Sequence, residues 1–286
     1  MEKTYEKRGY LNEDFRVFSL RDHRAPEIDY HYHEFNKAIF FVSGNASYYI
    51  DGSRYILEPG DVILIKRGLI HRPDVMSDAV YERIIFYIAP ELLAMYSEEE
   101  TDLESCFSEA AQLGRCVLRP PRRLSEKLRA MAENAVKAER DARFGGHMLA
   151  RLGVLSLAVE LCRAVRDTGV GAAPTEKFGE KTGGLIRYID SHLTEELTID
   201  KLAACMYMSK YHMMRRFREE TGFSVHEYIA HRRLNLAKGL MAGGMPATEA
   251  CYKCGYGSYS SFLRAYKKFS GESPSRSARA NLEYVD

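Results

Sequence analysis

The sequence predicts an α+β protein of two domains, an N-terminal β-barrel of the jelly-roll type with flanking helices and a C-terminal all-α domain. Three observations support this fold class. Short apolar runs separated by turn residues fill positions 15–90, which is typical of an all-β domain. Apolar residues recur at helical spacing from Pro90 onward. A unit of helix, turn and basic helix then occurs twice, so the C-terminal part contains an internal repeat.

The expected strands are runs rich in β-branched and aromatic residues. They are Phe15–Leu20, Ala38–Val42, Ala46–Ile50, Tyr55–Leu57, Val62–Lys66 and Tyr81–Ile88. Asp51-Gly52 between two of them is a strong hairpin signal. The runs are spaced evenly, and this favours a sandwich or a barrel over a mixed α/β sheet.

Histidines mark the candidate site of this barrel. His31 and His33 are two residues apart, so on a strand their imidazoles would share one face. Pro59-Gly60-Asp61 and a later histidine, His71, follow downstream. This pattern resembles the cupin barrel, which serves as a sensing domain in many transcription regulators. Metal-binding cupins carry a glutamate close to the position where this chain has Lys37.

Three interpretations of the histidines stay open. An ammonium at Lys37 would repel a cation, although three histidines alone can hold zinc, so a metal at His31, His33 and His71 is the weaker reading. The histidines could also be polar core residues. We favour a small-molecule pocket formed by His31, His33, Lys37 and His71, near Tyr30 and Tyr32, for a sugar, polyol or carboxylate effector. We expect no cofactor.

Helices are expected after the barrel, at Glu91–Tyr96, Leu124–Arg140 and His147–Arg166. Small residues then suggest a flexible linker. The expected organisation is a sensing and dimerisation domain over residues 1–166, with the barrel at about 10–90 and helices at about 91–166. A linker over 167–178 and a DNA-binding domain over 179–286 complete it. The helices could dimerise the protein, or they could only cover the barrel.

The repeat pairs Met208–Ser224 with Gly257–Ser273, 49 positions later. In each copy a serine can cap the helix and a glycine follows its last turn. A shorter helix precedes each copy, and a long helix over Ser224–Met241 joins the two. This is the layout of two helix-turn-helix units. Two ordinary amphipathic hairpins with solvated charges would be the alternative.

Residues 185–280 resemble the DNA-binding domain of AraC/XylS-type transcription regulators. The segments LTIDKLAACMYMSKYHMMRRFREETGFSVHEYIAHRRLNLAKGLM and EACYKCGYGSYSSFLRAYKKFSGESP carry the resemblance. Ala247, Ala250 and Ser277 depart from the family pattern, which could loosen the second unit. The resemblance implies a regulator that binds promoter DNA, acts as an activator and forms a homodimer through helices packed on the barrel. Contact with RNA polymerase would be compatible with that role.

Base-reading residues are expected at the start of each recognition helix. The resemblance carries this role to Tyr211, Met214, Arg215, Tyr259, Ser260 and Arg264. Basic residues beside them, Lys210, Arg216, Arg218, Lys267 and Lys268, are candidates for phosphate contacts or solvated charges. With the capping serines, the expected DNA-binding set is Ser209, Lys210, Tyr211, Met214, Arg215, Arg218, Ser258, Tyr259, Ser260, Arg264 and Lys267. The inner face (Leu202, Met213, Phe217, Phe262, Tyr266) should be core.

Charge and composition agree with this organisation. Residues 179–286 hold 16 Lys+Arg against 12 Asp+Glu, a formal charge of +4 in a chain of net charge +1, so only the C-terminal domain suits a polyanion. Cys251 and Cys254 form a C-x-x-C but are expected to be core residues. We expect a cytoplasmic protein, because no signal segment or membrane span is evident.

Two rival classes remain. A cupin enzyme fused to a DNA-binding tail would need a complete metal set, which Lys37 disfavours. A constitutive DNA-binding protein would use its barrel for dimerisation alone. The sequence supplies no nucleophile with a base and no phosphate-binding loop, so we do not expect an enzyme.

Overall fold

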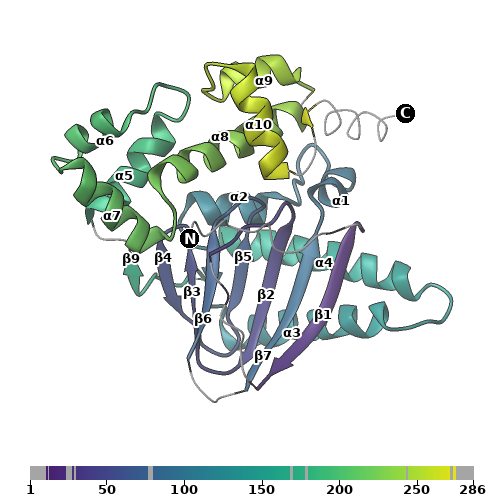
Figure 1. Cartoon of the computed structure of the whole chain (residues 1–286). Coiled ribbons are helices and arrows are strands. Elements are labelled where there is room, and N and C mark those ends of the chain that lie inside the picture. The colour runs from purple at the N-terminus through teal and green to yellow at the C-terminus, as the bar shows by residue number, and fades with distance from the viewer. Residues whose placement is uncertain are drawn as a thin grey trace. The chain divides into compact units, whose positions relative to one another are not determined.

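The computed structural model (Figure 1) describes residues 11, 13–23, 28, 30–76, 80–167, 170–177, 180–242, 244–270 and 273–274. The chain divides into two compact units, Met1–Lys177 and Phe178–Asp286. Each unit is described by itself below. None of the described helices is both long enough and apolar enough to cross a lipid bilayer.

The N-terminal unit contains two antiparallel sheets. The first has the strand order β1 (Phe15–Asp22), β7 (Tyr81–Ile88), β2 (Asn36–Ser43), β5 (Val62–Ile65) and β8 (Val117–Leu118). The second has the order β6 (His71–Val75), β3 (Ala46–Ile50), β4 (Ser53–Ile56) and β9 (Glu176–Lys177). A sheet unit with helices is confirmed. Among the described residues, however, no strand pairing joins the two sheets into a closed barrel.

Side chains alternate across the first sheet and so belong to two different cores. Along β2, Ala38 and Phe40 join an outer apolar cluster shared with the helices. Their neighbours Ile39 and Phe41 join an inner cluster between the sheets, together with Tyr48 of β3. Because the side-chain period of a strand is two residues, Lys37 lies on the inner face with Ile39. This parity puts a charged residue between the sheets.

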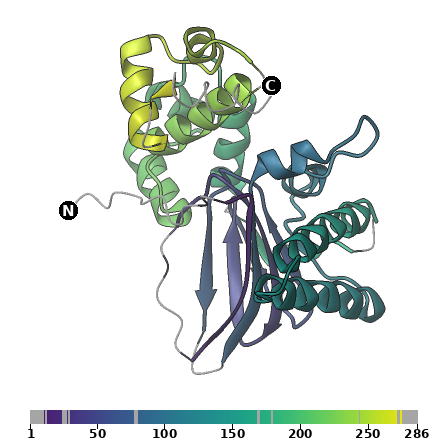
Figure 2. The same cartoon turned by 90° about the vertical axis from the view of Figure 1, so that its right-hand side faces the viewer.

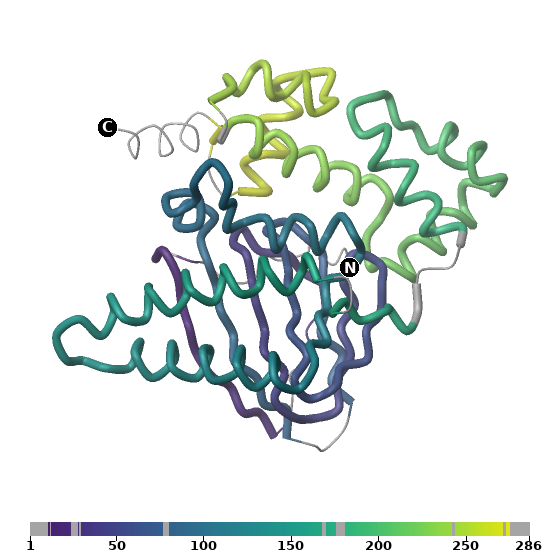
Figure 3. The backbone as a smooth tube through the Cα atoms, turned by 180° about the vertical axis from the view of Figure 1, so that it is seen from behind, coloured from purple at the N-terminus to yellow at the C-terminus, as the bar shows by residue number. Residues whose placement is uncertain are grey.

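Helices cover the outer face of the first sheet. They are α1 (Pro90–Met95), α2 (Ser105–Gln112), α3 (Arg122–Glu139) and α4 (Gly146–Arg166). Figures 2 and 3 show α3 and α4 as an antiparallel pair that runs along this face. Sequence periodicity predicts α1, α3 and α4 to within two residues at each end. It misses α2, which is only eight residues long.

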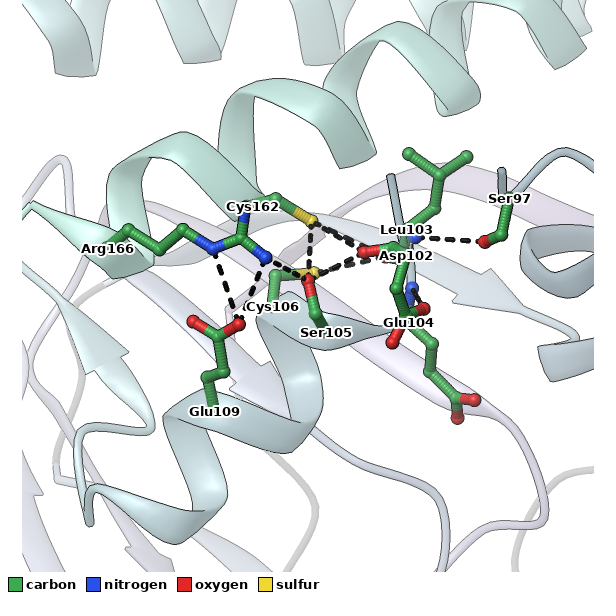
Figure 4. A network of polar contacts seen from close by, with 9 residues as sticks. All are labelled: Ser97, Asp102, Leu103, Glu104, Ser105, Cys106, Glu109, Cys162 and Arg166. Carbon is green, nitrogen blue, oxygen red and sulfur yellow. Dashed lines mark hydrogen bonds and ion pairs between the residues drawn. The ribbon is translucent and has the colours of Figure 1, made fainter. Parts of the chain in front are cut away.

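A polar network fixes α2 against α4 (Figure 4). Arg166 donates to Oγ of Ser105 and to Oε1 of Glu109, both at 3.1 Å. The Ser105 hydroxyl in turn lies 3.6 Å from Sγ of Cys162. Because these bonds tie the first turns of α2 to the last turn of α4, the short helix is held although its own propensity is weak.

The segment predicted as a flexible linker is held in place over its described residues 170–177. The backbone N–H of Ala172 donates to the carbonyl of Val117 at 2.9 Å, and that of Thr175 donates to the carbonyl of Arg54 at 2.8 Å. β9 then pairs with β4. These residues therefore run along β8 and β4 in the structure, and a flexible linker over 167–178 stays a prediction.

The C-terminal unit is all-helical. Its helices are α5 (Glu180–Ser191), α6 (Ile199–Cys205), α7 (Lys210–Thr221), α8 (Val225–Ala242), α9 (Ala247–Lys253) and α10 (Tyr259–Ser270). α7 packs near the start of α8 through Phe217 and Tyr228, whose ring centroids lie 5.5 Å apart. α10 packs further along α8 through Phe269 and His231, at 5.3 Å (Figure 1).

The predicted inner face of this unit is confirmed. Leu202, Met213, Phe217, Phe262 and Tyr266 are all buried. Cys251 and Cys254 are also fully buried, as expected of small core residues. Ser209 caps α7 by accepting from the N–H of His212 at 3.3 Å, and Gly222 ends α7 in a left-handed conformation with φ of 78°. The matching Gly271 and the departure at Ser277 lie outside the described residues.

Candidate functional site

Three buried histidines converge between the two sheets. The ring centroid of His31 lies 4.9 Å from that of His33 and 4.3 Å from that of His71, and the rings of His33 and His71 are 5.0 Å apart. The sequence predicts this convergence but for the wrong reason. Residues 31–33 are not in a strand; His31 is held instead by an isolated bridge, in which it exchanges backbone hydrogen bonds with His71.

His71 begins β6, a strand that the sequence does not predict because Pro73 and two charged residues interrupt its apolar pattern. β6 is an edge strand in the described sheet, and edge strands tolerate proline. Nδ1 of His71 lies 2.9 Å from the carbonyl oxygen of Leu69. A carbonyl can only accept, so Nδ1 carries the proton and Nε2 carries the lone pair.

Burial, with the neighbouring charges of His31, His33 and Lys37, holds the pKa of His71 well below its usual value. The imidazole is therefore neutral at physiological pH. Its Nε2 is buried and has no hydrogen-bond partner among the described residues. The ring thus presents a lone pair that can accept a proton donor or bind a metal ion.

Lys37 completes the predicted set. It is 7% exposed, and its ammonium lies 5.6 Å from the centroid of the Tyr87 ring. Burial first, and the charge of Arg83 second, lowers the pKa of Lys37 to about 7. The ring of Tyr87 also lies 5.9 Å from that of His33. All four predicted effector-site residues, His31, His33, Lys37 and His71, are therefore buried in one region.

Arg83 and Tyr87 of β7 are members of this region that sequence reasoning misses. Arg83 is 7% exposed and pairs with Asp22 of β1 at 2.5 Å. A usable signal exists, because Arg83 interrupts an apolar strand at the same parity as inward-facing Ile85. Tyr30, which the sequence suggests as a pocket residue, packs its ring against Tyr49 and the guanidinium of Arg72.

His31, His33 and His71 could hold a metal ion, since each offers one nitrogen and these atoms lie within 4.8 Å of one another. This is the one such group of histidine, cysteine and acidic residues in the described part of the chain. Three imidazoles suit zinc. The ammonium of Lys37 lies in the same region and disfavours a cation there.

The Pro59-Gly60-Asp61 turn is held together by Asp61. The carboxylate of Asp61 is 1% exposed and takes two bonds from Arg119, at 2.9 Å from Nε and 2.8 Å from Nη2. It also accepts from the N–H of Glu58 at 2.9 Å. Asp61 therefore closes the turn before β5, and none of these bonds involves the histidines.

In the C-terminal unit, the predicted DNA-binding side chains lie on the outer faces of α7 and α10. Every member of the set is exposed except Tyr259, which is half-buried against Phe262 with ring centroids 5.9 Å apart. Tyr211 is 72% exposed, and Met214 is 37% exposed although both are large. Each outer face lies over a buried inner face, so these side chains can contact a partner without disturbing the core.

Several of the predicted cations are already paired within the unit. Lys210 of α7 forms an ion pair with Asp200 of α6. Arg215 pairs with Glu219 at 2.8 Å, and Arg216 pairs with Glu220 at 2.7 Å, each one turn along α7. These exposed pairs are weak and can be exchanged for phosphate contacts.

Tyr207 is a candidate that the sequence does not single out. It lies in the turn between α6 and α7 with φ of 51°, and its side chain is 93% exposed. An exposed aromatic in a left-handed conformation is uncommon. Tyr207, Tyr211 and Met214 are all large side chains that remain exposed around the start of α7.

Comparison with known proteins identifies both units. Residues 17–147 match the AraC-like ligand binding domain, and residues 202–280 match a helix-turn-helix domain. The chain is 23% identical over 265 residues to the probable transcriptional regulator LumQ of Photobacterium leiognathi, covering 92% of this chain and 95% of LumQ.

Two further relatives match about a third of the chain. The right origin-binding protein of Escherichia coli K12 is 32% identical over 91 residues, which are 32% of each chain. The transcriptional activator AarP of Providencia stuartii is 30% identical over 103 residues, covering 36% of this chain and 76% of AarP. The matched families are those of transcription regulators rather than enzymes. The chain belongs to the AraC family of DNA-binding transcriptional regulators, with an AraC-like ligand-binding domain followed by a helix-turn-helix domain.

Proposed function

We propose that this protein is a transcription activator that binds a promoter operator as a homodimer and responds to a small polar effector. Sensing and dimerisation would occupy residues 1–166, residues 167–178 would connect the domains, and residues 179–286 would read DNA. The observation that carries this proposal is the exposure of the predicted base-reading side chains on α7 and α10 above buried inner faces. This role requires access to the chromosome, so we assign the protein to the cytoplasm.

The dimensions of the C-terminal unit support reading by both helices. α8 has 18 residues and therefore spans about 27 Å. Successive major grooves on one face of B-DNA are about 34 Å apart. A connector of this length suits two recognition helices in adjacent grooves. Arg215 and Arg264 would bond guanine, while Tyr211, Met214 and Tyr207 would contact thymine methyl groups.

The buried polar set supports effector binding in the N-terminal unit. His31, His33, Lys37 and His71 supply a few polar groups within an otherwise apolar interior, which is typical of small-molecule sites. A sugar, a polyol or a carboxylate would each find partners there. The effector would shift the DNA affinity of the protein, and contact with RNA polymerase would turn binding into activation.

Exposed apolar residues on α4 support dimerisation. Met148, Leu149 and Leu152 are 57%, 59% and 55% exposed on one side of the helix. Leu149→Glu combined with Leu152→Glu should give a monomer in analytical ultracentrifugation. Met95→Glu, at an equally exposed apolar position on α1, is the matched control and should leave the dimer intact. A wild-type monomer at micromolar concentration would refute this part of the proposal.

The test of the regulatory function is DNase footprinting on the DNA upstream of the protein's own gene, at two salt concentrations and with Arg215→Ala and Arg264→Ala. We expect a salt-resistant footprint of about two helical turns per monomer that both variants lose. Diffuse binding that disappears in salt, with and without candidate effectors, would contradict sequence-specific reading.

A further inference from the structure

Two basic side chains face the interior between the two sheets, and one of them has no carboxylate partner among the described residues. Lys37 and Arg83 are both 7% exposed and face this interior. Arg83 is paired with Asp22, at 2.5 Å. In the part of the chain that the structure describes, no carboxylate pairs with the ammonium of Lys37. Burying an unpaired ammonium is costly, so a ligand with a single negative charge would stabilise this site.

The second requirement comes from His71, which is completely buried. Its Nδ1 donates to the carbonyl of Leu69, so its Nε2 can only accept. This Nε2 accepts no hydrogen bond from any described residue. An unsatisfied buried acceptor costs about 1–3 kcal/mol, and a ligand hydroxyl would satisfy it.

The two groups are close enough for one small molecule. The ring of Tyr87 lies under the ammonium of Lys37 at 5.6 Å and beside the ring of His33 at 5.9 Å. The ring of His33 lies 5.0 Å from that of His71. The rings of Tyr87 and His33 therefore link the ammonium of Lys37 to the ring of His71 through neighbouring contacts.

We propose that the effector is a small hydroxy acid, whose carboxylate pairs with Lys37 and whose hydroxyl donates to Nε2 of His71. The inference deepens the proposed function and rests on it, because it assumes that the effector binds between the sheets. A phosphate monoester carries nearly two negative charges, which is more than the one ammonium of Lys37 requires. A metal ion would use the same lone pair, but it would add positive charge where Lys37 and Arg83 already supply it.

The experiment compares matched ligands on the full-length wild-type protein by thermal shift and calorimetry. The hydroxy acids are glycolate, lactate, glycerate, gluconate and salicylate. Each has a partner that lacks the hydroxyl (acetate, propionate, benzoate) or the charge (lactamide, glycerol, glucose). Glucose 6-phosphate tests a doubly charged anion. Because these pairs differ only in the ligand, the comparison does not depend on whether a variant folds.

We expect at least one hydroxy acid to bind, and its partner that lacks the hydroxyl or the charge to bind at least about tenfold more weakly. Lys37→Met should remove the preference for the acid over its uncharged partner. Lys137→Met, at an exposed position on α3, is the matched control and should bind like the wild type. Failure of every hydroxy acid to bind would overturn the inference, as would equal or tighter binding of the uncharged partners or of the phosphate. One equivalent of zinc or iron, found by elemental analysis and lost in His33→Ala, would overturn it too.

Footprinting with the same ligands separates this inference from the proposed function. A neutral sugar that changes the footprint while no hydroxy acid binds would overturn the hydroxy-acid inference and retain effector-responsive regulation. A hydroxy acid that binds with the expected preference but leaves DNA binding unchanged would support the chemical class. It would overturn the proposed response to effector.

Discussion

Nε of Arg215 donates to Oε1 of Glu219 at 2.8 Å, one turn further along the exposed face of α7. The side chain proposed to read a base is therefore held by a carboxylate that DNA phosphates would repel. Glu219→Gln removes this competition. We expect it to tighten operator binding by about two- to fivefold and to increase the salt dependence.

The control for this prediction is Glu220→Gln, which breaks the same kind of pair with Arg216 at 2.7 Å. Arg216 and Glu220 are more buried than Arg215 and Glu219, so the change should alter operator affinity less. Titration by fluorescence anisotropy at three salt concentrations measures both. If Glu219→Gln weakens binding, the pair orients Arg215 rather than competing with DNA for it.

Arg215→Ala should cost about 1–3 kcal/mol of operator binding and relax the preference at one base pair. Lys210 serves as the comparison, because it is exposed on the same helix and is predicted to contact phosphate. Lys210→Ala should weaken binding to all sequences equally. Binding to a library of operator variants measures both effects. A uniform loss for Arg215→Ala would make that arginine a phosphate contact.

Arg119→Met should destabilise the N-terminal unit by about 3 kcal/mol. The substitution leaves the carboxylate of Asp61, which is 1% exposed, without its two charged hydrogen bonds. Removing one partner of a buried ion pair costs about 3–5 kcal/mol, and the partial exposure of Arg119 favours the lower end. Arg122→Met breaks a solvent-exposed pair with Glu126 and should leave the unfolding free energy almost unchanged. Equal effects in urea unfolding would contradict this account.

Gly255→Ala should destabilise the C-terminal unit by more than about 2 kcal/mol. Gly255 has φ of +94°, and an added Cβ would lie 2.8 Å from the carbonyl oxygen of Leu193 and 2.9 Å from Nε of Arg233. Those two atoms are hydrogen-bonded to each other at 2.9 Å, so the methyl group would disrupt the bond. Gly257→Ala has open space and no unusual φ, so its thermal unfolding should match the wild type.

Acid should weaken the C-terminal unit through His231. Burial lowers the pKa of His231 to about 3, with a smaller contribution from Arg232, whereas an unfolded histidine has a pKa of about 6.5. Below pH 6.5 His231 binds a proton in the unfolded chain but stays neutral in the native state. The free energy of unfolding therefore falls with decreasing pH, by about 2 kcal/mol at pH 5.

Hydrogen exchange at the amides of α8 in the full chain, at pH 7.5 and pH 5, measures this loss. His231→Leu should remove most of the difference between the two pH values. His226→Leu, at an exposed position on the same helix, should keep it. An unchanged pH dependence in His231→Leu would assign the acid sensitivity to other groups.

Local sequence patterns predict an element correctly where its own residues determine its structure. Runs rich in β-branched and aromatic residues predict β2 and β7, and the repeated serine before α7 and α10 predicts where both helices begin. Patterns fail where tertiary partners decide. β6 contains Pro73, and its pairing comes from β3 and from the distant His31.

In the candidate site, too, some residues can be predicted from a local pattern and others depend on distant partners. H-x-H and the later histidine can be found in the sequence because, with the Pro59-Gly60-Asp61 turn between them, they match the cupin pattern. The parity of β7 places Arg83 on the inner face, but spacing cannot reveal its partner Asp22, which is 61 residues away on β1. Whether the two sheets close into a barrel also depends on pairing between distant strands, which no local pattern encodes, and the described strands form two separate sheets.

The last residues of the N-terminal unit are attached to it by only two residue pairs, between β9 and β4. The segment leaves this unit along the sheet whose other edge strand, β6, begins at His71. Two residue pairs at a sheet edge are among the first contacts to open in a folded protein. Opening them would lengthen the free tether before residue 178 without breaking the core between the sheets. The reach of the tether is thus set by a few backbone hydrogen bonds, and small changes in that sheet can alter it.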